Sequence, residues 1–386
     1  MRKFVGMCAT LACCLFLFTS ISFAGDGVDH KAKVIKLAGF DAVTGKYGNY
    51  GASDKVGQEI AIAQINAMGG IQAGPLKGYK LELSFFDDRG DAREAANVGK
   101  KISAGDYLAV MGPTMSSSAL AATPIFNRYR IADIITYANA SSITSQGFDN
   151  LARLPFTTKT IADAIAKCIG NEMGMKTAAV ISENQDYGQQ LYEGLLEVES
   201  KYGVKTVSQD VITAGQDVDF KSVLTRAKSA NPDVLVLFVT YNEGGLIVRQ
   251  TREMGWEIPI VTVDAMTDPK FFELAGDVRN ISFVINADID QTTPQAQYLN
   301  AEYEKRTGEK IAPTAAVFGY DAVQVARKII ENGATTREEF IKGIRGVEVK
   351  GGIFSSLYTF DKNGDSKSFN FVTISAEDYK KTLNIE

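Results

Sequence analysis

From residue 34 onward, short apolar runs alternate with longer segments in which apolar residues recur every three or four positions. Segment 50–68 shows the helical spacing at four apolar positions, Val56, Ile60, Ala63 and Ala67. The first part of the chain has predicted strands at 34–38, 81–86, 108–111 and 133–137, and predicted helices at 50–68, 92–104 and 118–128. Such alternation is typical of βαβ units, which build a mostly parallel sheet with helices on both faces.

The alternation restarts after a connector at 154–160. Here the predicted helices are 161–173, 187–202, 220–230 and 244–254, and the predicted strands are 177–182, 205–211, 234–239, 258–263 and 281–285. Every residue of 234–239 is apolar, as expected of a central parallel strand that is buried on both faces. The second half therefore repeats the α/β organisation of the first.

The C-terminal part contains two longer helical patterns, at 294–306 and 314–331. The tail predicts a hairpin, because strand-like segments 357–360 and 369–374 flank the turn signal Asn363-Gly364. No proline-rich or low-complexity linker separates the two halves. We therefore expect two α/β lobes, each with a doubly wound parallel sheet, joined by several short crossings.

The first 24 residues have the features of a secretory signal peptide. Arg2 and Lys3 precede an apolar run, and Ser22-Phe23-Ala24 places small residues at positions −3 and −1 of a cleavage site. We therefore expect export and cleavage near Ala24. The alternative is an uncleaved membrane anchor, since the apolar run is nearly long enough to span a bilayer.

Composition narrows the possible functions further. Cleavage would leave Cys168 as the only cysteine, so no internal disulfide could form, and the loss of Arg2 and Lys3 would take the formal net charge from −5 to −7. This negative balance argues against a nucleic acid or an anionic membrane as partner. The single histidine, His30, lies near the leader, so a Ser-His-Asp site or a histidine-ligated metal site lacks its key residue. With no nucleotide-binding glycine motif either, we expect no enzymatic activity, no cofactor and no metal.

Polar residues follow several of the predicted strands, at the point where each strand ends. Met115-Ser116-Ser117-Ser118 lies between a strand and a helix, where hydroxyls and the first helical N–H groups can bind a carboxylate. Tyr137-Ala138-Asn139 follows the next strand, and Tyr187, Tyr241 and Asp264 follow strands of the second half. Because the carboxyl ends of parallel strands share one edge, these residues should face one another across a cleft. Together they offer what an amino acid needs, and we assign Asp264 to the ammonium group.

Two acidic segments are rival candidates for metal sites. Asp87, Asp88 and Asp91 stand beside an arginine, as in an ordinary solvated loop. The turn 361–365 suggests a calcium loop, but its glycine comes too early and no glutamate closes a 12-residue ring. We therefore favour neither as a metal site.

Several motifs, in their order along the chain, resemble those of the periplasmic branched-chain amino-acid-binding proteins. They are Tyr50-Gly51, the run from Ile65 to Ile71, Phe86-Asp87-Asp88, Gly112-Pro113 followed by Ser116-Ser117-Ser118, Asp186-Tyr187-Gly188, Thr213-Ala214-Gly215 with Asp219-Phe220, and Phe360-Asp361 with Gly364-Asp365. The similarity extends over nearly the whole mature chain. It implies a type I periplasmic binding protein fold with three crossings, a monomer in the periplasm, and the permease subunits of an ABC importer as partners. It also implies lobe 1 at 32–157 plus 288–356, and lobe 2 at 158–287 plus 357–386.

The resemblance also implies roles for individual residues. Ser116, with N–H groups near Asn139, would bind the ligand carboxylate, and the carbonyls of Tyr137 and Asn139 would join Asp264 at the ammonium. Four tyrosines would wall the side-chain pocket above a floor of Thr114 and Met115. The complete expected site is Tyr50, Thr114, Met115, Ser116, Ser117, Tyr137, Ala138, Asn139, Tyr187, Tyr241, Asp264 and Tyr320.

Three positions depart from the family pattern. The family often has alanine, threonine and glutamate where this chain has Tyr137, Asn139 and Asp264. We therefore expect an amino acid with a branched-chain, other apolar or aromatic side chain, without deciding among these. The alternatives are a ligand-sensing receptor domain of the same fold and a binder of a small carboxylate that is not an amino acid.

Overall fold

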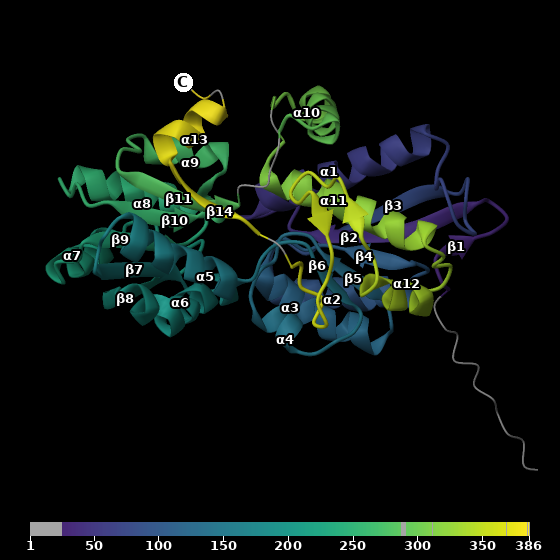
Figure 1. Ribbon diagram of the computed structural model, residues 1–386, viewed down its shortest axis with the longest axis horizontal. Helices are drawn as coiled ribbons and strands as arrows, with labels where there is room; N and C mark the ends of the chain where they lie inside the picture. The colour runs from purple at the N-terminus through teal and green to yellow at the C-terminus, as the bar shows by residue number, and fades with distance from the viewer. Residues whose placement is uncertain (1–24, 287–290, 311, 368, 384, 386) are drawn as a thin grey trace, which may run out of the picture.

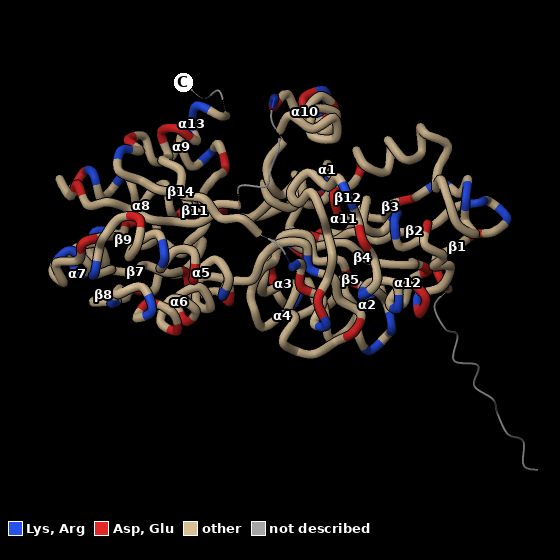
Figure 2. The backbone as a smooth tube through the Cα atoms, in the orientation of Figure 1, with Lys and Arg blue, Asp and Glu red and all other residues tan. Residues whose placement is uncertain are grey.

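The computed structural model describes residues 25–286, 291–310, 312–367, 369–383 and 385. The predicted signal peptide, residues 1–24, lies outside the described residues. Two six-stranded sheets, each covered by helices, lie side by side along the long axis of the molecule (Figure 1). Positions of Lys and Arg are interspersed with positions of Asp and Glu along the helices and loops of both halves (Figure 2).

The first sheet consists of β1 (Val28–Asp29), β2 (Val34–Asp41), β3 (Lys80–Asp87), β4 (Ala109–Met111), β5 (Ala132–Ile135) and β6 (Leu151–Arg153). Strands β3-β2-β4-β5-β6 run parallel, and the short β1 pairs antiparallel with the start of β2. Its helices are α1 (Gly48–Ala67), α2 (Ala92–Ala104), α3 (Ser116–Arg128), α4 (Ser142–Ser145), α10 (Pro294–Thr307), α11 (Thr314–Glu331) and α12 (Arg337–Ile344). This half corresponds to the first predicted lobe.

The second sheet consists of β7 (Thr177–Glu183), β8 (Lys205–Ile212), β9 (Val234–Phe238), β10 (Ile260–Val263), β11 (Ile281–Asn286) and β14 (Phe371–Ser375). Its order is β14-β11-β10-β9-β7-β8, and β14 is antiparallel to β11. Its helices are α5 (Thr158–Lys167), α6 (Asp186–Val198), α7 (Lys221–Ser229), α8 (Tyr241–Glu253), α9 (Pro269–Ala275) and α13 (Ala376–Thr382). Strand β9 is fully buried, as its uninterrupted apolar sequence predicts.

The chain passes between the two halves three times. It does so between β6 and α5, between β11 and α10, and between β13 (Leu357–Tyr358) and β14. These passages confirm the predicted two-lobe α/β fold with three crossings. The limits of each lobe within the crossings stay a prediction.

The predicted C-terminal hairpin is wrong. Strand β13 pairs with β12 (Val349–Lys350), whereas β14 pairs with β11 in the other half of the molecule. The turn itself is present, because the Asp361 N–H donates to the Asp365 carbonyl at 2.9 Å. The chain after the turn leaves for the second sheet instead of returning along β13.

Candidate functional site

The carboxyl ends of strands from both sheets meet around one pocket, with an empty volume of about 370 Å³ that includes its open mouth. The lining comes from the start of α1, the segments after β4 and β5, the start of α6 and the segments after β9 and β10. The lining residues are Tyr50, Thr114, Met115, Ser116, Tyr137, Asn139, Tyr187, Thr240, Asp264 and Ala265. Eight of these ten were expected from the sequence. The carboxyl ends of parallel strands are where α/β folds bind small molecules, so this position suits a ligand.

Asp264 is the only acidic residue among the lining residues, and it is 7% exposed. Its Oδ2 accepts a hydrogen bond from the Tyr137 hydroxyl at 3.0 Å, across the two halves. No donor among the described residues reaches Oδ1 with hydrogen-bonding geometry. Burial raises the pKa of Asp264 to about 6, against the opposing effect of the Tyr137 hydrogen bond. One oxygen of a buried carboxylate is therefore still to be satisfied, which favours a donor-rich or cationic ligand group.

The first half of the molecule contributes hydrogen-bond donors to the lining. Ser116 is the first residue of α3, where the helix dipole attracts negative charge. The Ala140 N–H donates to Ser116 Oγ at 3.2 Å, so the serine can direct its own proton elsewhere. Ser116 and Asp264 thus present a donor and an acceptor from different halves of the molecule.

Two expected site residues have internal partners. The Thr114 N–H and hydroxyl donate to the buried carboxylate of Asp41 at 2.9 Å and 2.8 Å, which holds the turn below the pocket. The Asn139 carbonyl accepts from the Thr158 N–H at 2.7 Å, which uses one of its two lone pairs. These bonds fix the backbone on which the lining residues stand.

Aromatic rings form the wall. The Tyr50 hydroxyl donates to the Ala265 carbonyl at 2.6 Å, and its ring lies 6.1 Å from that of Tyr137, centroid to centroid. Tyr187 is also buried, and its hydroxyl has no hydrogen-bond partner among the described residues. Burial raises the pKa of all three hydroxyl groups, so all three stay protonated and can donate.

Four expected residues do not line the pocket. Tyr241 packs behind the wall, with its ring 5.0 Å from that of Tyr50. Tyr320 lies in the contact between α11 and α1, where its hydroxyl donates to Gln64 Oε1 at 2.5 Å. Ser117 and Ala138 are neighbours in sequence of lining residues but are not part of the lining. The Tyr320 side chain therefore faces the neighbouring helix in this structure, and its role in ligand binding stays a prediction.

Two lining residues, Thr240 and Ala265, were not expected. Each directly adjoins a residue that was, Tyr241 and Asp264 respectively. Position after a strand end is the only sequence signal that could have found them, because a threonine and an alanine carry no distinctive chemistry.

The rival acidic segments have structural roles. Asp87 accepts from the Thr44 hydroxyl at 2.5 Å, and Asp91 caps α2 by accepting from the N–H groups of Arg93 and Glu94. Within the described ranges, no group of three or more His, Cys, Asp or Glu side chains could hold a metal ion. The same part of the chain contains no helix with both the length and the apolar character needed to cross a membrane.

Further contacts bridge the two halves around the pocket. Lys46 Nζ lies 2.6 Å from Glu243 Oε1, and Gln185 Nε2 donates to the Tyr47 hydroxyl at 2.6 Å. Glu243 is almost fully buried, and it also accepts from the Gly215 N–H at 2.8 Å. The halves are therefore held together by polar contacts at the rim as well as by Tyr137 and Asp264.

Comparison with known proteins gives a consistent picture. Residues 34–372 match the family model described as periplasmic binding protein. The leucine-, isoleucine-, valine-, threonine- and alanine-binding protein of Pseudomonas aeruginosa is 27% identical over 92% of this chain and 93% of its own. A leucine-binding protein from Thermotoga maritima has a TM-score of 0.78 at 25% identity, covering 89% of this chain and 99% of its own. A solute-binding protein from R. palustris, solved with benzoate, has a TM-score of 0.75 at 20% identity, covering 89% and 96%.

Proposed function

Because the chain belongs to the periplasmic binding protein family, we propose that it binds an amino acid between its two lobes and delivers it to an ABC importer. The family consists of solute-binding proteins, so this is a binding protein and not an enzyme. The observation that carries the proposal is the unpartnered Oδ1 of buried Asp264, a lining residue of the pocket to which the other half of the molecule contributes Ser116. A buried carboxylate is stabilised by a cation that donates to it, and an amino acid supplies one.

The two ends of a zwitterion match the two sides of the pocket. Its ammonium group would donate to Asp264 Oδ1 and to the Tyr187 hydroxyl oxygen, both of which have no partner among the described residues. Its carboxylate would accept from Ser116 at the start of α3. Exclusion of water makes these few polar contacts count for more than they would on a surface.

The side chain of the ligand is left with a mainly apolar space. Tyr50, Met115 and Ala265 line it, with Thr114 and Thr240 as the polar exceptions. This lining supports an apolar side chain. The curated relative from Pseudomonas aeruginosa, whose name includes alanine and threonine as well as the branched-chain residues, is consistent with such a site.

Lobe closure would complete the site. Tyr137 and Asp264 come from different halves, so the pocket is assembled only when the halves meet. A dissociation constant near the micromolar range, about −8 kcal/mol, would allow both retention and release. The further parts of the proposal are a monomer in the periplasm, with the predicted signal peptide removed, and the importer's permease subunits as partners.

A second candidate ligand is a small carboxylate without an ammonium group. The Tyr137 hydroxyl already donates to Asp264, and a pKa of about 6 lets Asp264 become neutral under mildly acidic conditions. The structural neighbour solved with benzoate has the same fold. A carboxylate ligand would use Ser116 and leave the Tyr137–Asp264 contact intact.

Isothermal titration calorimetry of residues 25–386 against the twenty amino acids and benzoate tests the proposal. We expect at least one apolar amino acid to bind, and Asp264→Asn to weaken it at least about tenfold, because the ion pair with the ammonium is lost. The matched control is Asp219→Asn, at an exposed aspartate in the second half. Binding of benzoate alone, unchanged by Asp264→Asn, would favour the second candidate, and no binding by any of these ligands would contradict both.

A further inference from the structure

The acidic turn 361–365 resembles a cation-binding loop in sequence, and in the structure it faces a cation of the protein itself. Asp361 Oδ1 accepts from the N–H groups of Asn363 at 2.7 Å and Asp365 at 3.0 Å. Gly364 has a φ of 95°, a conformation that favours glycine. The carboxylate of Asp361 is therefore occupied in folding the turn, and the turn presents Asp365 to the interior.

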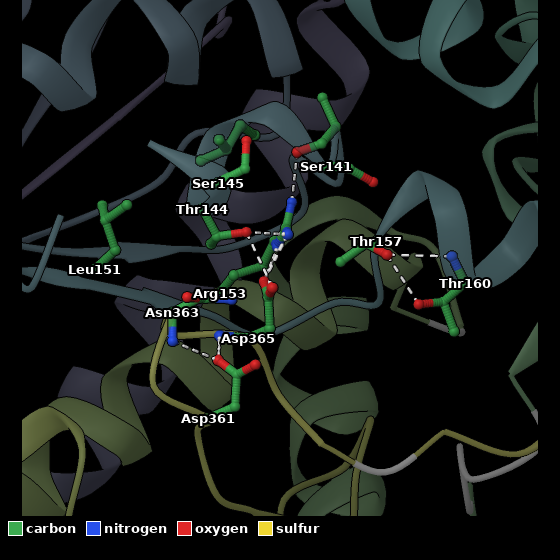
Figure 3. A network of polar contacts seen from close by, with 12 residues as sticks. Ser141, Thr144, Ser145, Leu151, Arg153, Thr157, Thr160, Asp361, Asn363 and Asp365 are labelled. Atoms are coloured by element: carbon green, nitrogen blue, oxygen red, sulfur yellow. Dashed lines mark hydrogen bonds and ion pairs between the residues drawn. The ribbon is translucent and has the colours of Figure 1, made fainter. Parts of the chain in front are cut away.

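Asp365 meets the guanidinium group of Arg153, a side chain with no solvent exposure (Figure 3). Asp365 Oδ1 accepts from Arg153 Nε at 2.8 Å and from Nη2 at 2.5 Å. Asp365 Oδ2 accepts from the Thr144 hydroxyl at 3.0 Å. Asp365 is thus the charge partner that allows this arginine to be buried.

The remaining donors of Arg153 reach the loop that carries the candidate ligand residues. Nη1 donates to the Ala140 carbonyl at 2.6 Å. Nη2 donates to Thr144 Oγ1 at 2.6 Å (Figure 3). On the other side of the same residue, the Ala140 N–H donates to Ser116 Oγ. A continuous series of hydrogen bonds therefore runs from Asp365 through Arg153 and Ala140 to Ser116.

The position of this series in the fold connects it to the crossings. Arg153 is the last residue of β6, immediately before the first crossing, and Asp365 lies on the third crossing. Their backbones are also paired, since the Arg153 N–H donates to the Gly364 carbonyl at 2.8 Å and the Ser366 N–H donates to the Arg153 carbonyl at 3.2 Å. Two of the three crossings are therefore held side by side at the point where Arg153 donates hydrogen bonds to Ala140 and Thr144.

We propose that Arg153 and Asp365 are positioning residues for ligand binding, which tie loop 137–142 to the paired crossings and so hold the carboxylate side of the pocket in place. Within the described ranges the pair forms no hydrogen bond to a lining residue, and it acts through Ala140. The test with ligand rests on the proposed function. The hydrogen-bonded connection between the pair and loop 137–142, called the tie below, can be tested without a ligand.

The ligand-free test is hydrogen–deuterium exchange of the Asp365→Asn variant. We expect amides of 137–145 to exchange at least about tenfold faster, with those of α11 unchanged, because the loss is local. The matched control is Asp149→Asn, which breaks the exposed Arg130–Asp149 pair of the same half. Equal exchange of 137–145 in the two variants would overturn the proposal.

The ligand test separates positioning from general destabilisation. The probes are L-leucine and L-leucinamide. Asp365→Asn should lower the affinity for L-leucine at least about tenfold and the affinity for L-leucinamide less than about twofold, because only L-leucine places a carboxylate next to loop 137–142. Equal loss for both probes would contradict a positioning role. If no amino acid binds the wild-type protein, the proposed function fails, while the exchange result still decides the tie.

A second variant covers the case in which Asp365→Asn does not fold. Thr144→Val keeps the shape of the side chain and removes only the hydroxyl that joins Arg153 and Asp365. It should produce the same local increase in exchange with a smaller amplitude. No increase at 137–145 in folded Thr144→Val would count against the tie.

Discussion

Asp264 concentrates the chemistry of the site in a single side chain. Its carboxyl group is buried, its pKa is raised to about 6, and only one of its oxygens has a partner within the described part of the chain. The cause of the raised pKa is burial, which disfavours the charged form. The same burial makes the charged form a strong partner for an ammonium group. Ligand affinity and protein stability should therefore depend on pH in opposite directions.

Amino-acid affinity should be level above about pH 7 and fall by about tenfold per pH unit well below pH 6, because protonation of Asp264 competes with the ammonium. The unbound protein should behave in the opposite way. A folded pKa above the unfolded value means that Asp264 contributes stability below about pH 4, and that this contribution is lost as pH rises to about 6. Calorimetric titrations between pH 5 and about 7.5 measure the first effect, and urea unfolding over about pH 4–7 measures the second.

The control for both is Asp264→Asn. Asp321, whose pKa burial also raises to about 6, remains in that variant. Both slopes should therefore be shallower in Asp264→Asn than in the wild type, and slopes equal to those of the wild type would contradict the role of Asp264.

At the scale of elements, local pattern predicted most of the fold and could not predict remote pairing. Helices α2 and α11 have the predicted bounds, because apolar periodicity and their end signals are local. The hairpin prediction failed because the partner of β14 is β11, and three helices and two strands of the described part of the chain lie between these two strands. Short elements such as β6 and α12 were missed, since too few residues establish a period.

For the candidate site too, some residues could be expected from local sequence and others could not. Residues after strand ends were found because parallel strands share an edge, and this holds for Ser116, Asn139 and Asp264. Tyr320 sits on a helix, and the sequence does not say which neighbour a helical side chain faces. The Arg153–Asp365 pair could not be predicted, because its partners come from the two separate crossings.

The packing of α1 against α11 supplies a prediction at this scale. A Cβ on Gly57 would lie 2.0 Å from the Ala316 carbonyl oxygen, so the two helices must separate to accept it. Gly57→Ala should lower the free energy of unfolding by about 1–3 kcal/mol or more, measured by urea denaturation.

Gly346→Ala is the matched control for this helix contact. A Cβ at Gly346 has no heavy atom within 4 Å, so its effect should stay within about 0.5 kcal/mol. Equal stability of the two variants would mean that the helices are not in close contact.

At the scale of the whole molecule, contacts between the halves determine how firmly the pocket is covered. Lys46 and Glu243 form an ion pair at the rim, with side-chain exposures of 23% and 4%. Opening the lobes would leave Glu243 without its cation while it keeps the Gly215 N–H and the Thr240 hydroxyl. The ion pair should therefore favour the closed arrangement, in which ligand is retained.

Lys46→Met should increase the rate of ligand dissociation at least about threefold, with a smaller effect on association, because a contact present only between closed lobes is lost. Stopped-flow tyrosine fluorescence with an excess of competing ligand measures this rate. Lys55→Met is the control, since Lys55 pairs with Glu59 on its own helix. A dissociation rate equal to that of the control would exclude Lys46 from lobe closure.

The most direct measurement is a crystal structure of residues 25–386 grown with the amino acid that binds most tightly. The account predicts the ligand between the two sheets, with its ammonium nitrogen within about 3.2 Å of Asp264 Oδ1 and its carboxylate at Ser116 and the start of α3. A ligand bound elsewhere, or bound in this pocket with its carboxylate next to Asp264, would contradict it.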